Sequence, residues 1–167
     1  MSKRGHHEQA GDTMSWRRNT ARVLPVDPEG RVLLLHGWDP RRPEDPFWFT
    51  IGGAVEGGET LPEAGARELH EETGIRVDPV LLGEPIESSL AEFSWAGMDF
   101  VQDQTFFAVA ISPDVAVSFD GQESLERATT DKHGWLLPSA LEDGSVDRPA
   151  DPDLPRVMRL AVSAVRC

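Results

Sequence analysis

Three glutamates are spaced along one short stretch so that their carboxylates could converge on a metal ion. Glu68, Glu71 and Glu72 lie in an acidic segment that follows a glycine-rich run. In an α-helix, residues three and four apart share nearly the same face, so Glu68 stands about one turn from Glu72 and close to Glu71. Carboxylate oxygens are hard ligands that suit Mg²⁺ or Mn²⁺. The spacing therefore predicts a divalent metal site.

The segment that carries these carboxylates has the signals of a short helix over residues 61–73. Thr60 is placed as the N-cap, and Glu63 stands three residues on as its capping-box partner. Pro62 falls in the first turn, where its missing N–H costs nothing, and Gly74 suits a left-handed end. We expect the helix to start and stop at these residues.

A charged helix face is often no more than a solvated face. Here the electrostatics argue against that reading, because Glu68 and Glu72 are like charges four residues apart. Glu71 and Glu72 also crowd the helix C-terminus, where the macrodipole disfavours each anion by roughly 0.3–1 kcal/mol. A bound cation would turn this repulsion into attraction.

The stretch from Gly53 to Ile75 resembles the signature of the Nudix hydrolases at every fixed position. The pattern is a glycine, five residues, Glu59, seven residues, and then Arg67-Glu-apolar-any-Glu-Glu-any-Gly-apolar. The resemblance implies hydrolysis of a nucleoside diphosphate linked to another group, with Mg²⁺, or alternatively Mn²⁺, held by the loop and helix. Many members of the family have proline where Ile51 stands, which is a departure in the shape of the loop.

The metal-site assignments follow from the spacing and from this resemblance. Glu68 and Glu72, one turn apart, are the principal predicted metal ligands, and Glu71 is the next. Arg67, at i,i+4 to Glu71, is predicted to orient the carboxylates. The resemblance adds the carbonyl of Gly52 as a further ligand, with a tight turn of no ligand role as the alternative. It also brings Glu59 close to the site, where it could accept a hydrogen bond from Arg67 or from a metal-bound water.

The general base is sought outside the helix as well as on it. Glu126, ahead of Trp135, is the first loop candidate, followed by Glu123 and Glu92; the alternative for each is an exposed surface acid. Arg41 and Arg42 are predicted to bind a substrate phosphate in the bidentate manner of arginine, with solvated loop charges as the alternative.

Two aromatic residues, Trp48 and Phe49, lie just before the glycine-rich run. Because side chains alternate across a strand, one is expected in the core while the other could stack on a nucleobase. We take Trp48 as the candidate for substrate contact. Packing of both rings in the core is the alternative.

Composition limits the class of protein. The chain has 167 residues, 39% of them hydrophobic, which suits one domain. Its single cysteine, Cys167, excludes an internal disulfide, and neither a signal peptide nor an 18-residue apolar run is visible in the sequence. We therefore expect a cytoplasmic protein. The net charge of −13 argues against binding to nucleic acid or anionic membranes.

The expected partner is a small nucleoside diphosphate derivative, such as a nucleotide sugar, a dinucleotide or a nucleoside triphosphate. Two rival classes stay open: a domain that senses a nucleotide without cutting it, and a related isomerase with a cysteine in its site. The crowded carboxylates argue against the sensor, and the terminal position of Cys167 argues against the isomerase. Whether the protein is a monomer or a homodimer is left open.

The order of elements predicts an α/β fold. Residues 1–13 are expected to be a disordered tail and residues 14–167 a single domain, with Met1 or Met14 as the start. Pro25 suggests that the first strand is an edge or carries a bulge. Strands, a helix, more strands and a terminal helix predict a mixed β-sheet with helices on both faces, in agreement with the α/β/α sandwich that the resemblance implies. The expected elements are a hairpin at 20–36, strands at 47–51, 75–82, 86–95, 100–111 and 134–137, a loop over most of 112–134, a helical turn at 138–141 and an amphipathic helix at 153–167 with Val157, Leu160, Ala161, Ala164 and Val165 as its apolar stripe.

Overall fold

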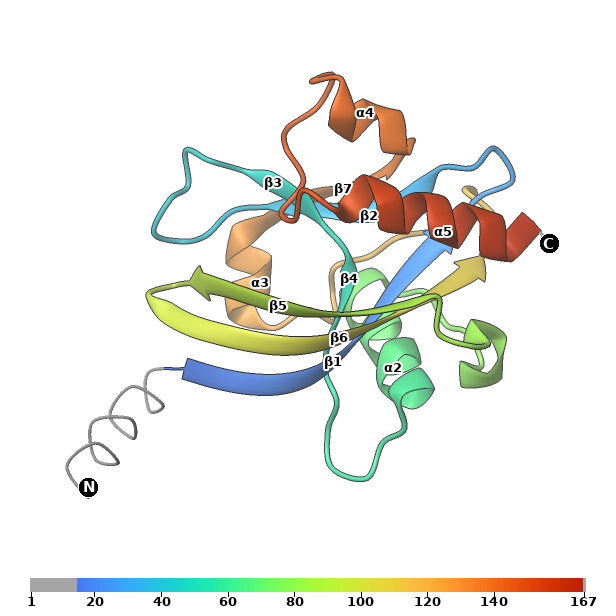
Figure 1. Cartoon of the computed structure of the whole chain (residues 1–167), viewed down its shortest axis with the longest axis horizontal. Coiled ribbons are helices and arrows are strands. Elements are labelled where there is room, and N and C mark those ends of the chain that lie inside the picture. The colour runs from blue at the N-terminus through green and yellow to red at the C-terminus, as the bar shows by residue number, and fades with distance from the viewer. Residues whose placement is uncertain (1–14, 167) are drawn as a thin grey trace.

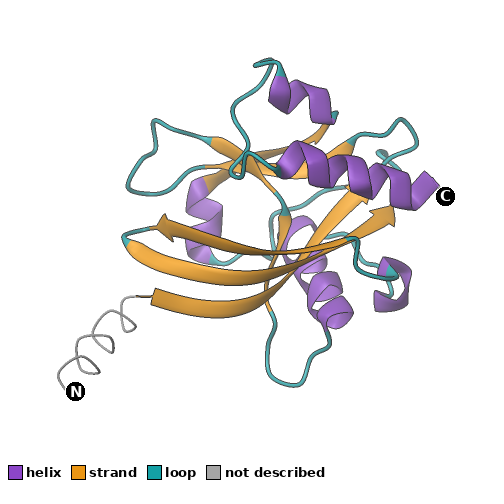
Figure 2. Cartoon of the chain, viewed as in Figure 1, coloured by secondary structure: helices purple, strands orange, loops and turns teal. Residues whose placement is uncertain are grey.

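The computed structural model describes residues 15–166, so the predictions for the N-terminal tail, for the start of the domain and for Cys167 lie outside the described part of the chain. Within it, the fold is a curled mixed sheet with helices packed against it (Figures 1 and 2). The strands are β1 (Ser15–Val26), β2 (Val32–Gly37), β3 (Phe47–Phe49), β4 (Ile51–Ala54), β5 (Glu87–Trp95), β6 (Met98–Ala110) and β7 (Thr130–Leu136). The helices are α2 (Leu61–Thr73), the 3₁₀ turn η1 (Pro79–Leu82), α3 (Ser124–Thr129), α4 (Pro138–Glu142) and α5 (Leu154–Arg166).

The sheet has seven strands in the order β3-β2-β1-β6-β5, with β4 beside β1 and β7 beside β2. The β1–β6 pair is parallel and the other pairs are antiparallel, so the sheet is mixed, as predicted. Both β5 and β6 are long and form a hairpin, and with β1 they make the curved three-stranded layer seen across the lower part of Figure 1.

The position of β1 corrects one prediction. The strand is central, with β6 along one side and β4 and β2 along the other, whereas Pro25 had suggested an edge. Pairing with β4 ends at Val23, and pairing with β2 is confined to Val26. Pro25 therefore lies between the end of the pairing with β4 and the start of the pairing with β2. On this side of β1, its missing N–H breaks no ladder of hydrogen bonds.

Helices α2 and α5 cover two different faces of the sheet. On β1, Ala21 and Val23 belong to the cluster under α2, while Leu24 and Val26 belong to the cluster under α5. Alternate side chains of β1 therefore pack into two different core clusters. Toward the N-terminal end of β1, the side chains on the face that α5 covers are Arg22 and, four residues earlier, Arg18. These two polar residues line a cleft.

Several predicted elements are confirmed and three are corrected. The first hairpin, the 86–95 and 100–111 strands, the turn at 138–141 and the terminal helix are present. Residues 75–82 form a loop and η1 rather than a strand, and α3 and β7 occupy the second half of the expected 112–134 loop. The buried stripe of α5 contains Leu154, Met158, Val157 and Ala161, whereas Leu160 is only partly buried and Ala164 is exposed. No helix within residues 15–166 is long and apolar enough to cross a membrane.

Candidate functional site

Helix α2 begins and ends where the sequence predicted. The Thr60 hydroxyl accepts from the Glu63 backbone N–H at 3.2 Å, and the Glu63 carboxylate accepts from the Thr60 N–H at 2.8 Å. At the other end, Gly74 has φ = +79° and donates its N–H to the His70 carbonyl at 2.8 Å. The cap at each end fixes the helix register. This register sets the direction of every carboxylate on α2.

The glycines of β4 bring backbone against the carboxylates. Gly52 has φ = +146°, and a Cβ at this position would lie 2.2 Å from the Ala21 carbonyl oxygen, so only glycine fits. The Gly52 N–H donates to Oε1 of Glu72 at 2.8 Å. Next to it, a Cβ on Gly53 would lie 2.7 Å from the Glu68 carboxylate. The glycine-rich strand therefore allows two carboxylates of α2 to lie against its main chain.

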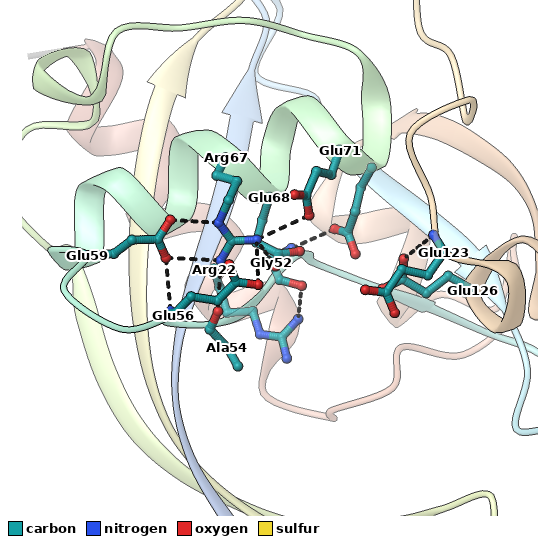
Figure 3. A network of polar contacts seen from close by, with 11 residues as sticks. Arg22, Gly52, Ala54, Glu56, Glu59, Arg67, Glu68, Glu71, Glu123 and Glu126 are labelled. Carbon is teal, nitrogen blue, oxygen red and sulfur yellow. Dashed lines mark hydrogen bonds and ion pairs between the residues drawn. The ribbon is translucent and has the colours of Figure 1, made fainter.

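Arg67 is the cation at the centre of the acidic group (Figure 3). Its Nε donates to Glu59 at 2.7 Å, and its Nη1 donates to Glu68 at 2.9 Å and to Glu71 at 3.1 Å. Its Nη2 donates to the carbonyl of Ala54 at 2.9 Å. Arg67 thus joins Glu59, Glu68 and Glu71 through one guanidinium. These contacts also raise the pKa of Arg67, chiefly through the hydrogen bond to Glu59, so it stays charged.

The two ligands predicted to be principal are also the most buried of the three glutamates. Glu72 is 5% exposed, the Glu68 side chain is 12% exposed, and the Glu71 side chain is 43% exposed. Burial, with the neighbouring Glu68 charge second, raises the pKa of Glu72 well above its ordinary value. Burial likewise raises the pKa of Glu68, against the opposing effect of Arg67. The site therefore holds anions together at a cost in free energy.

The donor set suits a hard divalent cation, although it is not assembled around one. Arg67 contacts Glu68 and Glu71, while among the described residues the Glu72 carboxylate accepts only the hydrogen bond from the Gly52 N–H. A cation would offset this poorly compensated buried charge. Within residues 15–166, no three His, Cys, Asp or Glu side chains converge closely enough to form a complete metal-binding cluster.

The Gly52 carbonyl, the further predicted ligand, also has a partner. Nη1 of Arg22 donates to it at 3.1 Å, and Nη2 of the same guanidinium donates to Oε1 of Gln102 at 2.9 Å. A carbonyl oxygen has two lone pairs, so this bond leaves one acceptor direction. Arg22 is a buried cation that the sequence analysis did not identify, and burial lowers its pKa.

A cleft of about 1270 Å³ opens beside this site. Its walls come from β1, β3, β4, the β5–β6 hairpin, α2, α3, the loop over residues 38–46 and the segment over residues 148–157. The predicted residues that line it are Glu68, Glu72, Gly52, Arg41, Arg42, Glu126, Glu123 and Glu92. Segments far apart in the sequence are therefore brought to one cavity.

Of the three candidates for the general base, Glu126 is the least exposed. Glu126 is partly buried on α3, and burial raises its pKa, with the Glu123 and Glu71 charges adding to the effect. Its carboxylate accepts from the Glu123 backbone N–H at 3.2 Å, which fixes it at the start of the helix (Figure 3). Glu123 and Glu92 are exposed on the cleft rim.

The loop over residues 38–46 is fastened to the tip of the β5–β6 hairpin. Oδ1 of Asp39 accepts from the Ala96 N–H at 3.0 Å and from the Arg41 N–H at 2.9 Å. The Arg41 guanidinium packs so tightly on Gly97 that a Cβ there would lie 2.2 Å from Nη1. Arg41 and Arg42 are exposed at the mouth of the cleft. They are thus placed where an entering anion would pass.

Trp48 does not reach the cleft. Its side chain is 5% exposed in the core cluster under α5, and its ring lies 4.8 Å from that of His36. The alternation along β3 turns Phe49 toward the cleft instead. The assignment of Trp48 to substrate contact is therefore corrected to the alternative of core packing. On the hairpin, the aromatic residues Phe93, Trp95 and Phe100 also line the cleft.

Residues 16–160 match the NUDIX domain family, and the fold, the capped helix and the acidic site agree with that match. The chain therefore belongs to the Nudix hydrolase family. Among solved structures, the MutT protein from Methanosarcina mazei Go1 is similar with a TM-score of 0.60 and 21% identity, over 87% of this chain and 94% of that one. At this identity the likeness shows the fold.

Curated relatives match over shorter regions. An octanoyltransferase from Myxococcus xanthus is 36% identical over 125 residues, which are 69% of this chain and 29% of that protein. A dihydroneopterin triphosphate diphosphatase from Escherichia coli K12 is 42% identical over 55 residues, 33% of this chain and 34% of that protein. The chain thus spans about a third of the length of the curated relatives it matches. The name of a much longer protein does not assign an activity to the shared region.

Proposed function

We propose that the chain is a divalent-metal-dependent pyrophosphohydrolase that acts on a small nucleoside diphosphate derivative. The observation that carries this proposal is the burial of Glu68 and Glu72 beside each other at the cleft, against the backbone of Gly52 and Gly53. Two buried like charges are unfavourable for a purely structural helix and favourable for a metal site. The relative from E. coli that is named for a triphosphate substrate supports the same class of reaction.

The metal ligands in this proposal are Glu68, Glu72 and Glu71, with the carbonyl of Gly52 as a further donor. A divalent ion such as Mg²⁺, when bound there, would neutralise charge on the phosphate oxygens and lower the pKa of water. Arg67 holds Glu68 and Glu71 through its Nη1 and is itself held by Glu59 and by the Ala54 carbonyl. This arrangement keeps the ligands in place without using the guanidinium itself as a substrate contact.

Glu126 is the proposed general base. It comes from α3, lines the same cleft as Glu68 and Glu72, and its pKa is raised by burial. A raised pKa brings a carboxylate closer to the pH at which it accepts a proton efficiently. In this role, Glu126 would take the proton of the water that attacks phosphorus in line with the leaving group.

The substrate class follows from the charges of the cleft. The chain carries a net charge of −13, so an anionic substrate needs local cations to enter. Arg41 and Arg42 at the mouth supply them, and the aromatic side chains of the hairpin offer flat apolar surface to a ring. A nucleotide sugar, a dinucleotide and a nucleoside triphosphate all combine a ring with a phosphate chain. We propose a substrate of this size.

A nucleotide sensor without hydrolytic activity is the second candidate. The observation in its favour is that arginines already contact Glu68, Glu71 and the Gly52 carbonyl. The two candidates differ in whether a covalent bond is broken. An incubation of the purified protein with a panel of nucleoside diphosphate derivatives in ¹⁸O-labelled water, with Mg²⁺ or with chelator, separates them by mass spectrometry. Hydrolysis predicts ¹⁸O in one phosphate product only when Mg²⁺ is present; intact compounds throughout would support the sensor.

A further inference from the structure

Arg18 is a partly buried arginine whose guanidinium has no acidic partner among the described residues. It makes no ion pair and no side-chain hydrogen bond within residues 15–166, and its Nε is buried without an acceptor. Its Cζ lies 4.9 Å from the centroid of the Phe100 ring, which in turn stacks on Phe93 at 5.4 Å. Burial lowers the pKa of Arg18, against the opposing effect of the Glu68 charge.

The preceding residue on β1, Arg17, is also an arginine, but it has an acidic partner. Arg17 points to the opposite face of β1, where it forms an exposed ion pair with Asp103 at 3.0 Å. Arg18 pairs in register with Gln102 of β6 and lines the cleft together with it. The alternation of the strand therefore turns one guanidinium to a carboxylate on the surface and the next one into the cleft.

The residues around Arg18 also have donors without acceptors. Gln102 is 1% exposed, and its Oε1 accepts from Arg22, so its amide Nε2 is left buried and unpartnered. The Nε of Arg22 is likewise buried without an acceptor. Unpaired buried N–H groups cost free energy, and here three of them belong to side chains from β1 and β6 that line the cleft. Donors without acceptors beside a cleft point to an anionic ligand.

We propose that Arg18 binds a phosphate group of the substrate through its non-bridging oxygens. This inference rests on the proposed function, because it names a further residue that contacts the same substrate. The Phe100 ring packs against the guanidinium, and Arg22 and Gln102, which are hydrogen-bonded to each other, line the same cleft. An arginine in this place offers a planar fork to two phosphate oxygens.

The test measures binding rather than turnover. Isothermal titration compares common nucleoside 5′-monophosphates with the matching uncharged nucleosides, in the presence of Mg²⁺, for the parent and for Arg18→Met. A monophosphate has no diphosphate linkage, so binding is measured without hydrolysis. A charged hydrogen bond lost from a cleft is expected to weaken monophosphate binding about tenfold to a hundredfold, while nucleoside binding stays within about twofold. Arg18→Lys should fall between the two proteins, because it keeps the charge and loses the fork.

Arg17→Met is the matched control, since it removes an arginine from the adjacent position on the outer face and should bind like the parent. Thermal melts verify folding, and the Arg18→Lys variant covers the case in which Arg18→Met fails to fold. Equal monophosphate affinity in the parent and in the folded Arg18 variants would overturn the proposal, as would failure of the parent to prefer monophosphate over nucleoside. If the parent binds as expected but cleaves no compound, the Arg18 proposal holds and the hydrolase proposal fails.

Discussion

The side chain that costs the fold most at this site is Glu72, which is buried next to a like charge and accepts one backbone hydrogen bond. In metal-free protein its raised pKa makes stability depend on pH. Between its unfolded pKa of about 4.5 and the higher folded pKa, the folded state binds the extra proton. Stability therefore falls as pH rises through this window, and above the folded pKa the whole penalty is present.

Glu72→Gln should remove the contribution of this residue to the pH dependence of stability. The amide oxygen of glutamine can still accept the Gly52 N–H, while the charge is absent. In chelator at pH 7 we expect the variant to be as stable as the parent or more stable by roughly 0.3–1 kcal/mol. This difference should shrink as pH is lowered toward 4.5. Urea unfolding of both proteins in chelator across that range measures it, and a parent that becomes relatively less stable at low pH would contradict the assignment.

The proposed role of Glu126 as general base leads to a prediction about kcat. If it is the general base, the acid limb of the kcat profile should have its midpoint above the ordinary pKa of glutamate, because burial raises the pKa of this residue. Glu126→Gln should lower kcat about a hundredfold with little change in KM and should abolish that limb. Glu123→Gln, a substitution of the exposed residue at the start of the same helix, should keep both. The same loss in both variants would assign the effect to the structure of α3 instead.

Among the elements, β4 is the one that depends most on single residues. Gly52→Ala places a methyl group 2.2 Å from the Ala21 carbonyl oxygen at φ = +146°, so we expect a loss of at least about 2 kcal/mol in stability. Gly57→Ala is the matched control, since no atom lies within 4 Å of a Cβ there. Denaturant unfolding compares the two, and equal stabilities would mean that β4 can shift without cost.

The elements that the sequence predicted best are those with local signals. Capping residues and a left-handed glycine determine both ends of α2, and these are short-range interactions that can be read from neighbouring residues. Residues 75–82 resembled a strand because they are apolar, but Asp78 accepts from the Val80 N–H and starts the turn of η1 instead. The prediction from Pro25 was wrong because a central strand can accept proline where the pairing with one neighbour ends and the next begins. The positions of β2 and β4 along β1 decide this, and they depend on long-range contacts.

At the scale of the molecule, the cleft combines the acidic helix with residues that no local motif marks. The carboxylates were predicted from their spacing and from the family signature. Arg22 and Gln102 were not, because their roles depend on the parallel pairing of β1 with β6, two strands that lie far apart in the sequence. Trp48 was placed wrongly for a similar reason, since the parity of a strand does not say which face is the core.

The central claim is that α2 is a metal-binding catalytic helix rather than a charged structural one. Thermal melts with chelator and with Mg²⁺, alongside turnover of an accepted substrate, test it on the parent and on Glu72→Gln. We predict that Mg²⁺ raises the melting temperature of the parent more than that of the variant, because a ligand that binds only the folded state stabilises it in proportion to its occupancy. Turnover of the variant at moderate Mg²⁺ should fall at least about a hundredfold. Near-parental turnover in Glu72→Gln, or a chelated parent that melts well above the chelated variant, would contradict the account.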